Sequence, residues 1–234
     1  MSDLDVFQGG DFSSDYRLRA LCSMIPGSGA LLDIGSGNGI LGTHVYHRFN
    51  SITLSDYSQE IVEMLKKRFT RDKKLKVLEL NAEEFVTKEK YNTITVCDVL
   101  EHLDDDGGCL RSCRDALAKN GVLFITVPAF QYLYGLRDKK YGHRRRYSKK
   151  DLRKVLEENG YSIQSLYYWN CIGVVPYLVS EKIFSKPLHA PARSGDEGVI
   201  SKIINKFLYA ILMVESFTWV PFGLTLVAVC RKKS

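Results

Sequence analysis

The stretch LLDIGSGNGILG, residues 31–42, places four glycines within eight positions directly after an apolar run. Residues 30–34 have the pattern of a buried strand, and the segment that follows, 39–49, can form a helix. Glycine adopts positive φ and lets a ligand approach the backbone closely, while the first turn of a helix offers free N–H groups. The stretch therefore predicts a ligand loop after the first strand of an α/β sheet.

Strand and helix patterns alternate along the rest of the chain. The further strand patterns cover residues 51–54, 76–80, 91–97, 122–127, 161–168 and 224–230. The helical patterns cover residues 61–69, 106–119 and 148–159, with Asn120-Gly121 and Asn159-Gly160 as left-handed stops. Ser148 and Asp151 fit a capping box at the start of the last of these helices. Strands separated by single helices predict an α/β fold with a mostly parallel sheet and helices on both faces.

Length and composition favour one globular domain. The chain has 234 residues, of which 45% are hydrophobic and 26% charged. We expect a single domain over residues 1–234, with residues 1–25 as an N-terminal helical cap and residues 168–222 as a helical, aromatic insertion on the substrate side. The six cysteines are scattered without a CxxC pair, so we expect reduced cysteines and no metal site.

Charge and targeting signals point to a cytoplasmic protein. The N-terminal segment is acidic and lacks the apolar core of a secretory signal. Residues 207–230 are apolar but contain Glu215, Pro221 and Gly223, so we expect a helix followed by a buried strand, although nearby aromatic residues would suit contact with a membrane surface. Residues 137–154 hold ten Lys or Arg against two Asp, a local net charge of +8, which leaves the remainder at −2. One surface is therefore basic.

Three interpretations of the glycine loop can be compared on these residues alone. Gly37, Gly39 and Gly42 match the dinucleotide pattern G-x-G-x-x-G, and Asp56 lies near the spacing of a ribose-binding acid. A phosphate loop is excluded because the loop has neither G-x-x-x-x-G-K-[ST] nor any Lys or Arg. A turn without a ligand would explain one or two glycines, but not four together with two acidic residues.

The later strand ends separate these alternatives. The motifs DIGSGNG, LSDYS, LNAEEF and CDVLEHLDD occur in order over residues 31–160, and this set resembles the class I S-adenosylmethionine-dependent methyltransferases. CDVLEHLDD followed by GVLFITVP resembles the branch that contains ubiquinone-biosynthesis O-methyltransferases. The segment VPAFQYLYGLRDKKYGHRRRYSKKDL resembles methyltransferases often found beside glycan or lipid biosynthesis enzymes. The resemblance implies a seven-stranded Rossmann-like sheet with its last strand antiparallel, and S-adenosyl-L-methionine as cofactor.

The resemblance also implies cofactor-binding roles for residues at these motifs. Those expected at the methionine end of the cofactor are Asp33, Gly35, Ser36, Gly37, Asp98, Val99 and Leu100. Those expected to border the adenine are Tyr57, Asn81, Ala82 and Glu83. Asp56 would hold both ribose hydroxyls, or would otherwise cap the helix that follows it. Glu101 and His102 would orient the loop into the next helix.

The loop after the fifth strand holds the candidate catalytic and acceptor-binding residues. His143 is the candidate general base, and the alternative is a surface histidine in a basic loop. Tyr141, Arg144 and Arg145 would bind an anionic or partly hydrophobic small-molecule acceptor, or would form a solvated face; nucleic acid is the weaker alternative.

The predicted activity is methyl transfer to a small molecule, more at oxygen than at nitrogen, in quinone, lipid, glycan or secondary-metabolite biosynthesis. Two alternatives are an inactive methyltransferase-like binding protein and an NAD-dependent oxidoreductase, although Tyr141 is followed at the fourth position by Arg145 where a Tyr-x-x-x-Lys pair would have lysine.

Overall fold

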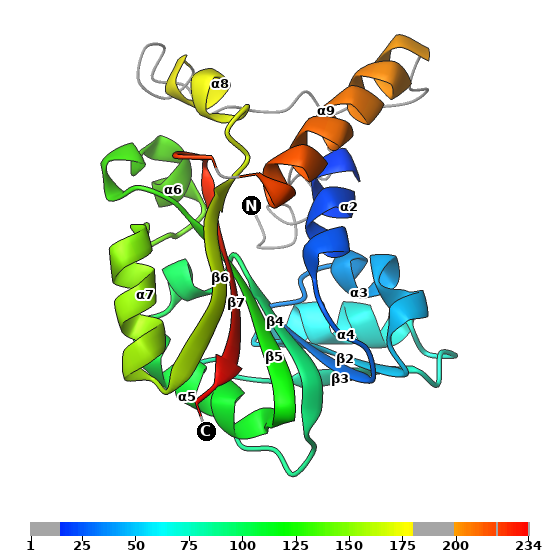
Figure 1. Cartoon of the computed structure of the whole chain (residues 1–234). Helices are drawn as coiled ribbons and strands as arrows, with labels where there is room; N and C mark the ends of the chain where they lie inside the picture. Colours follow the sequence, from blue (N-terminus) through cyan, green and yellow to red (C-terminus); the bar gives the residue numbers. More distant parts are fainter. Residues whose placement is uncertain (1–14, 180–198, 219, 234) are drawn as a thin grey trace.

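A seven-stranded sheet forms the centre of the molecule in the computed structural model, which describes residues 15–179, 199–218 and 220–233 (Figure 1). The strands are β1 (Ala30–Ile34), β2 (Ser51–Asp56), β3 (Leu75–Glu79), β4 (Tyr91–Cys97), β5 (Leu117–Pro128), β6 (Tyr161–Trp169) and β7 (Thr225–Lys232). Their order is β3-β2-β1-β4-β5-β7-β6. The pairs among β1 to β5 are parallel, whereas β7 is antiparallel to both β5 and β6. The predicted Rossmann-like sheet with an antiparallel last strand is confirmed.

Helices cover both faces of the sheet, and each face has its own hydrophobic core (Figure 1). One face carries α2 (Asp15–Met24), α3 (Ile40–His44), α4 (Gln59–Arg68) and α9 (Val199–Phe217). The other carries α5 (Asp106–Ala116) and α7 (Lys149–Glu158). Because strand side chains alternate between faces, Leu31 packs into the first core and Leu32 into the second.

The prediction for residues 116–121 was wrong. α5 ends at Ala116 rather than at residue 119, and β5 begins at Leu117, which is fully buried and pairs with Tyr91. Gly121 lies inside β5, next to an irregular register, and is not among the glycines with positive φ. A Cβ atom on Gly121 would lie 2.9 Å from the carbonyl oxygen of Tyr91, so this position needs glycine for close packing rather than for a left-handed turn.

Two further helix boundaries can be compared with the sequence patterns. The helix expected over residues 39–49 is shorter: α3 ends at His44, and a separate 3₁₀ turn, η1 (Tyr46–Arg48), follows. Val45 lies between them with a non-helical ψ of 3°, so the α-helix stops before this residue. Its side chain is fully buried in the core. The capping box of Ser148 and Asp151 is confirmed at the start of α7, and Gly160 ends that helix with φ of 85°.

The segments beyond β5 and β6 add short helices at the end of the sheet where the parallel strands terminate (Figure 1). They are η3 (Gln131–Leu133), α6 (Leu136–Lys140) and α8 (Val174–Leu178). Residues 207–230 form the end of α9 and most of β7, as expected. Within the described ranges, no helix combines the length and apolarity needed to cross a membrane. Residues 1–14 of the expected cap and 180–198 of the expected insertion lie outside the described residues.

Candidate functional site

The candidate site lies where the strand order reverses, between β1 and β4. The chain leaves β1 toward β2 and β3 on one side, and β4 continues to β5 on the other. In an open α/β sheet this reversal opens a crevice at the carboxyl ends of the strands. The loops after β1 and β4 meet there: a Cβ atom on Gly35, where φ is 70°, would lie 2.5 Å from Cγ2 of Val99. The backbone at Gly35 therefore has room only for glycine.

Hydrogen bonds hold the glycine loop in one conformation. The hydroxyls of Ser36 and Ser55 both donate to the carbonyl oxygen of Asp33, at 2.9 and 2.8 Å. The N–H of Gly37 donates to Oδ2 of Asp56 at 3.1 Å. Gly37 and Gly39 both have positive φ, and Gly39 immediately precedes α3. The loop is thus fixed to both neighbouring strand ends before any ligand binds.

Asp33 carries a buried carboxylate that is only half satisfied. Its Oδ1 accepts a 2.6 Å hydrogen bond from the hydroxyl of Thr95 on β4. Its Oδ2 has no hydrogen-bond partner among the described residues, although Asp33 is only 2% exposed. Burial raises the pKa of Asp33 to about 6. Oδ2 of Asp33, an unpartnered acceptor beside the glycine loop, fits a ligand with a positively charged group. The methionine end of S-adenosylmethionine carries such a group.

Asp56 lies at the carboxyl end of β2 with both oxygens facing backbone donors. Oδ1 accepts from the N–H of Ser58 at 3.1 Å, and Oδ2 accepts from Gly37. Ser58, not Asp56, is the N-cap of α4, because its hydroxyl accepts from the N–H of Ile61. Burial raises the pKa of Asp56. Each carboxylate oxygen has a second lone pair, so this arrangement leaves acceptors for two ribose hydroxyls.

The residues expected at the adenine follow the ends of two neighbouring strands, β2 and β3. Tyr57 is 74% exposed and Asn81 is exposed, whereas Ala82 is buried. Glu83 already has partners, since its Oε1 accepts from the N–H groups of Asp104 and Asp105 at 2.5 and 3.0 Å. Its carboxylate thus ties the end of β3 to the loop that precedes α5.

The end of β4 turns sharply into the second half of the site. Asp98 has a φ of 54°, and its Oδ1 accepts from the hydroxyl of Thr126 at 3.0 Å. The backbone then forms the 3₁₀ turn η2 (Leu100–His102), with Leu100 fully buried. This turn carries Glu101 and His102 beside the crevice.

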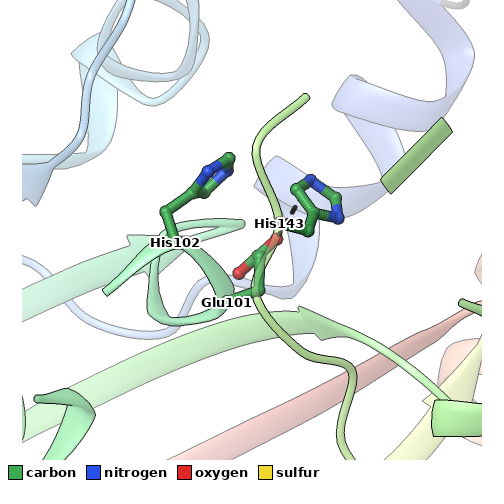
Figure 2. A group of neighbouring side chains, drawn as sticks. All are labelled: Glu101, His102 and His143. Carbon is green, nitrogen blue, oxygen red and sulfur yellow. Dashed lines mark ion pairs between the residues drawn. The ribbon is translucent and has the colours of Figure 1, made fainter. Parts of the chain in front are cut away.

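Glu101, His102 and His143 form a cluster at this end of the sheet (Figure 2). The rings of His102 and His143 pack edge to face, with centroids 4.7 Å apart. His143 Nε2 lies 4.0 Å from Oε1 of Glu101, and its Nδ1 lies 2.8 Å from Oδ1 of Asp138. The His143 side chain is 16% exposed. His143 was expected to be either a general base or a surface histidine in a basic loop. Its low exposure and its contacts exclude the exposed surface histidine.

The Glu101 carboxylate is fully buried and both of its oxygens lack hydrogen-bond partners within the part of the chain that the structure describes. Burial, with the carboxylate of Asp98 nearby, raises the pKa of Glu101 well above its ordinary value. Isolated buried carboxylates are costly, so this group calls for a proton or a cation.

The basic segment after α6 contacts the η2 loop. Arg144 donates to the carbonyl oxygen of His102 at 2.7 Å and forms an ion pair with Asp104. Arg145 donates to the carbonyl oxygen of Leu103 at 2.7 Å and lies 3.3 Å from Asp106. Both guanidinium groups therefore link the loop that carries His143 to the segment that joins η2 to α5. Contact of either group with an acceptor remains a prediction.

Tyr141 lies in the same segment, with its ring centroid 6.3 Å from that of His143. The guanidinium of Arg137 lies 5.6 Å from the centre of the Tyr141 ring. Tyr141 thus borders the cluster, and its role in binding an acceptor also remains a prediction.

Asp138 is the residue of the site that the sequence patterns did not single out. It is fully buried, and Oδ1 also accepts from Nε of Arg146 at 2.8 Å. The hydrogen bond from His143 and the Arg146 guanidinium lower the pKa of Asp138 to about 2 despite its burial. The spacing D-x₄-H-x₂-R holds these three residues, but in a segment so rich in charge it gives no distinct signal.

Comparisons with known proteins identify the family of this chain. The family model for a methyltransferase domain matches residues 12–166. A ubiquinone biosynthesis O-methyltransferase of Actinobacillus pleuropneumoniae serotype 5b (strain L20) is 29% identical over 104 residues, which are 42% of this chain and 44% of that protein, so the match spans less than half of this relative.

Solved structures share the fold. A Haloferax volcanii methyltransferase in complex with the Trm112 activator superposes with a TM-score of 0.67 at 13% identity, covering 99% of this chain and 94% of that one. The N-methyltransferase NodS of Bradyrhizobium japonicum WM9, in complex with S-adenosyl-L-homocysteine, gives 0.56 at 14% identity and covers 94% and 85%. With the family model spanning more than half of its length, this chain belongs to the class I S-adenosylmethionine-dependent methyltransferases.

Proposed function

We propose that this protein transfers a methyl group from S-adenosylmethionine to an oxygen atom of a small-molecule acceptor. The family match and the unpartnered Oδ2 of Asp33 support the cofactor. The observation that carries the choice of oxygen is the cluster of Glu101, His102 and His143 at the crevice. The names of the relatives as O-methyltransferases agree with this choice.

The chain's own groups would hold the cofactor at three points. Asp33 and the loop through Gly37 would face its methionine end, and Asp56 would take the ribose hydroxyls through its remaining lone pairs. Bound S-adenosylmethionine supplies an activated methyl group on a sulfonium. The protein's main contribution is then alignment, which can lower a barrier by about 7–11 kcal/mol.

An oxygen acceptor makes a demand that an amine does not. A neutral amine attacks with its own lone pair, whereas a hydroxyl must lose its proton during or before attack. Glu101, His102 and His143 can take part in that step because they place one carboxylate and two imidazoles within one small volume. Because a neutral amine makes no such demand, the cluster favours oxygen over nitrogen.

Aromatic side chains at the end of β6 and at the start of the loop between β5 and α7, the loop that also carries His143, support an acceptor that is partly hydrophobic. Phe130 stacks on Tyr168 with centroids 4.7 Å apart, and Tyr132 is 71% exposed beside them. Flat apolar surface of this kind suits an aromatic or aliphatic acceptor. We place the protein in the cytoplasm, where S-adenosylmethionine is made, with contact to a membrane surface as a further expectation for a lipid-like acceptor.

The oxidoreductase alternative is disfavoured by the family match, which is to a methyltransferase domain, and not by Gly42, because the third glycine of a dinucleotide-binding loop also serves helix–strand packing. Gly42, the third glycine of the dinucleotide pattern, lies within α3, and a Cβ atom there would be 2.6 Å from Cδ2 of Leu54. Gly42 therefore serves helix–strand packing, as the residues that surround it are core side chains. The ligand loop consists of the earlier glycines.

Isothermal titration with S-adenosyl-L-homocysteine tests the cofactor part of the proposal. Replacement of Asp56 by Ala should weaken binding by at least about tenfold, because hydrogen bonds to a charged group are worth about 1.5–3 kcal/mol. Glu60→Ala is the matched control, since Glu60 is an exposed acid in the first turn of α4. No binding by the wild type, or equal binding by both variants, would contradict the proposal.

A transfer assay with labelled S-adenosylmethionine tests the acceptor atom. Paired small molecules that differ only in a hydroxyl or an amine at the same position should show labelling of the hydroxyl member. Labelling restricted to the amines would overturn the choice of oxygen and leave the cofactor assignment intact.

A further inference from the structure

Three buried side chains form a network behind the ring of His143. Asp138 lies on α6, Arg146 in the loop after that helix and Tyr177 on α8, and none of them is more than 7% exposed. The guanidinium of Arg146 joins the other two, because Nε donates to Oδ1 of Asp138 and Nη2 to the hydroxyl of Tyr177, both at 2.8 Å. A buried ion pair adds little stability over apolar side chains of similar size, so this network calls for a role beyond stability.

The same guanidinium connects segments that come together at this end of the sheet. Its Nη1 donates to the carbonyl oxygen of Ala129, directly after β5, at 3.2 Å. The Tyr177 hydroxyl donates in turn to the carbonyl oxygen of Leu133 on η3 at 2.8 Å, and the centre of the Tyr177 ring lies 4.9 Å from the guanidinium carbon. Arg146 and Tyr177 therefore fix α8 to the loop that carries His143.

Asp138 determines which nitrogen of His143 carries the proton. Burial opposes ionisation of this carboxyl, but the hydrogen bond from His143 and the charge of Arg146 outweigh burial and lower the pKa of Asp138 to about 2. An ionised carboxylate only accepts hydrogen bonds, so the 2.8 Å contact between its Oδ1 and Nδ1 of His143 requires the proton on Nδ1. The neutral ring then has its lone pair on Nε2, which lies 4.0 Å from Oε1 of Glu101.

The backbone of His143 is held separately from its ring. Its N–H donates to the carbonyl oxygen of Asp138 at 2.9 Å, and its carbonyl oxygen accepts from the hydroxyl of Tyr134 at 2.7 Å. The ring also contacts that of His102, whose centroid is 4.7 Å away. These contacts place the residue, whereas the tautomer depends on the carboxylate at Nδ1.

We propose that Arg146 and Tyr177 are positioning residues that act through Asp138: they keep Nε2 of His143 free of a proton and tie α8 to this histidine. The consequence for catalysis rests on the proposed function. Nε2 takes the proton of the acceptor hydroxyl while the oxygen bonds to the methyl carbon, the carbon–sulfur bond breaks, and its electron pair remains on sulfur. The imidazolium that results is stabilised by the carboxylate of Asp138.

The ring nitrogens of His143 report the tautomer without any acceptor. Nuclear magnetic resonance of the full chain, isotope-labelled in nitrogen, should show the neutral ring protonated on Nδ1, with the signals assigned by their loss in His143→Gln. Asp138→Ala should move the proton to Nε2, the form that an unrestrained histidine favours. Arg146→Lys and Tyr177→Phe should give a mixture of the two forms, because each removes hydrogen bonds that hold the carboxylate in place.

Two variants outside the site are matched controls. Arg114 on α5 pairs with Asp115 at 3.2 Å and donates to a carbonyl oxygen, as Arg146 does. The hydroxyl of Tyr46 on η1 donates to Asp72 at 3.1 Å. Arg114→Lys and Tyr46→Phe should leave the ring signals of the histidine as in the wild type. Circular dichroism confirms that each variant is folded.

Turnover separates positioning from cofactor binding. With a hydroxyl compound that the wild type methylates, Asp138→Ala should lower kcat by about 100-fold or more, the contribution of a general base. Tyr177→Phe should lower kcat by about 2–10-fold, as expected for one hydrogen bond. The KM for S-adenosylmethionine should stay the same in both variants, because the cofactor residues Asp33 and Asp56 lie on other strands, β1 and β2.

The proposal is overturned if folded Asp138→Ala keeps the proton of His143 on Nδ1, or if Tyr177→Phe matches Tyr46→Phe in both tautomer and kcat. Where Asp138→Ala does not fold, its combination with Arg146→Met, which removes both charges of the buried pair, provides the comparison. The expected tautomer in the wild type together with methylation of amines alone would contradict the proposed function and leave the network standing.

Discussion

At the scale of single residues, Asp33 couples the cofactor site to pH. Burial raises the pKa of Asp33 to about 6 in the protein without ligand, and the negative charge of Asp56 adds to this shift. The thiols of Cys22 and Cys97 also face Asp33, but burial raises the pKa of each far above neutrality, so both stay uncharged near pH 6. Near pH 6 Asp33 therefore changes its charge while both thiols stay neutral.

We predict that S-adenosylmethionine binds more weakly below pH 6. A cationic ligand favours the charged carboxylate, so binding must displace a proton below the pKa and costs about tenfold in affinity per pH unit there. Above pH 6 this cost disappears. Calorimetric titrations between pH 5 and 8 measure the slope. Asp33→Asn keeps the size of the side chain and should flatten the profile, except for the smaller effect of Asp56, whose pKa burial also raises. An unchanged slope in the variant would contradict the role given to Asp33.

At the scale of elements, the start of α3 depends on Gly39 for two separate reasons. Its φ is 74°, which costs a residue with a side chain about 1–2 kcal/mol. A Cβ atom there would also lie 2.8 Å from Cδ2 of Leu65, 3.0 Å from Phe69 and 3.1 Å from Leu54. Gly142 has nearly the same φ, 73°, with no atom within 4 Å of its Cβ position. The pair separates backbone strain from steric conflict.

We expect Gly39→Ala to destabilise the protein by about 2–5 kcal/mol and Gly142→Ala by only about 1–2 kcal/mol. The difference is the cost of overpacking a buried site, about 1–3 kcal/mol. Urea unfolding followed by circular dichroism measures both, and an unchanged slope with denaturant would show that only stability changed. Equal losses of stability in the two variants would mean that the side chains beside Gly39 accommodate a methyl group without destabilising the protein.

The elements also show what the sequence could predict. Periodicity located all seven strands, because each is bounded by turn residues and packs its alternate side chains into one of the two cores. It misassigned Gly121 as the end of a helix. An Asn-Gly pair can end a helix, but it can also lie within a strand where the glycine packs against a neighbouring carbonyl group. Here the pairing of Leu117 with Tyr91 places Gly121 in the strand, and the sequence does not show that pairing.

The sequence also predicted only part of the candidate site. The loop motifs fall at consecutive strand ends, which parallel topology brings to one edge, so Asp33, Asp56 and Asp98 could be placed together. The contact between Glu101 and His143 could not, because it joins segments some 40 residues apart. Asp138 could not, because it lies in a charged loop without periodicity.

At the scale of the whole molecule, the first and the last helix of the described chain pack together. α2 and α9 lie side by side against the sheet (Figure 1). The hydroxyl of Ser23 lies 3.0 Å from the sulfur of Met213, and the indole N–H of Trp169 on β6 donates to the carbonyl oxygen of Leu212 at 3.0 Å. The first helix, the last helix and the sheet therefore form one packed unit around Leu212, which is fully buried.

Leu212→Ala should destabilise the protein by about 2–5 kcal/mol, because it removes a buried side chain from the core that α9 shares with α2 and β6. Val214→Ala, two residues along the same helix at a side chain that is 59% exposed, should change stability by no more than about 0.5 kcal/mol. Urea unfolding provides both values. Limited proteolysis should cut Leu212→Ala within α9 or α2 faster than the control, because the packed unit opens locally before the sheet does. If α9 were only an appendage, both variants would unfold and be cleaved like the wild type.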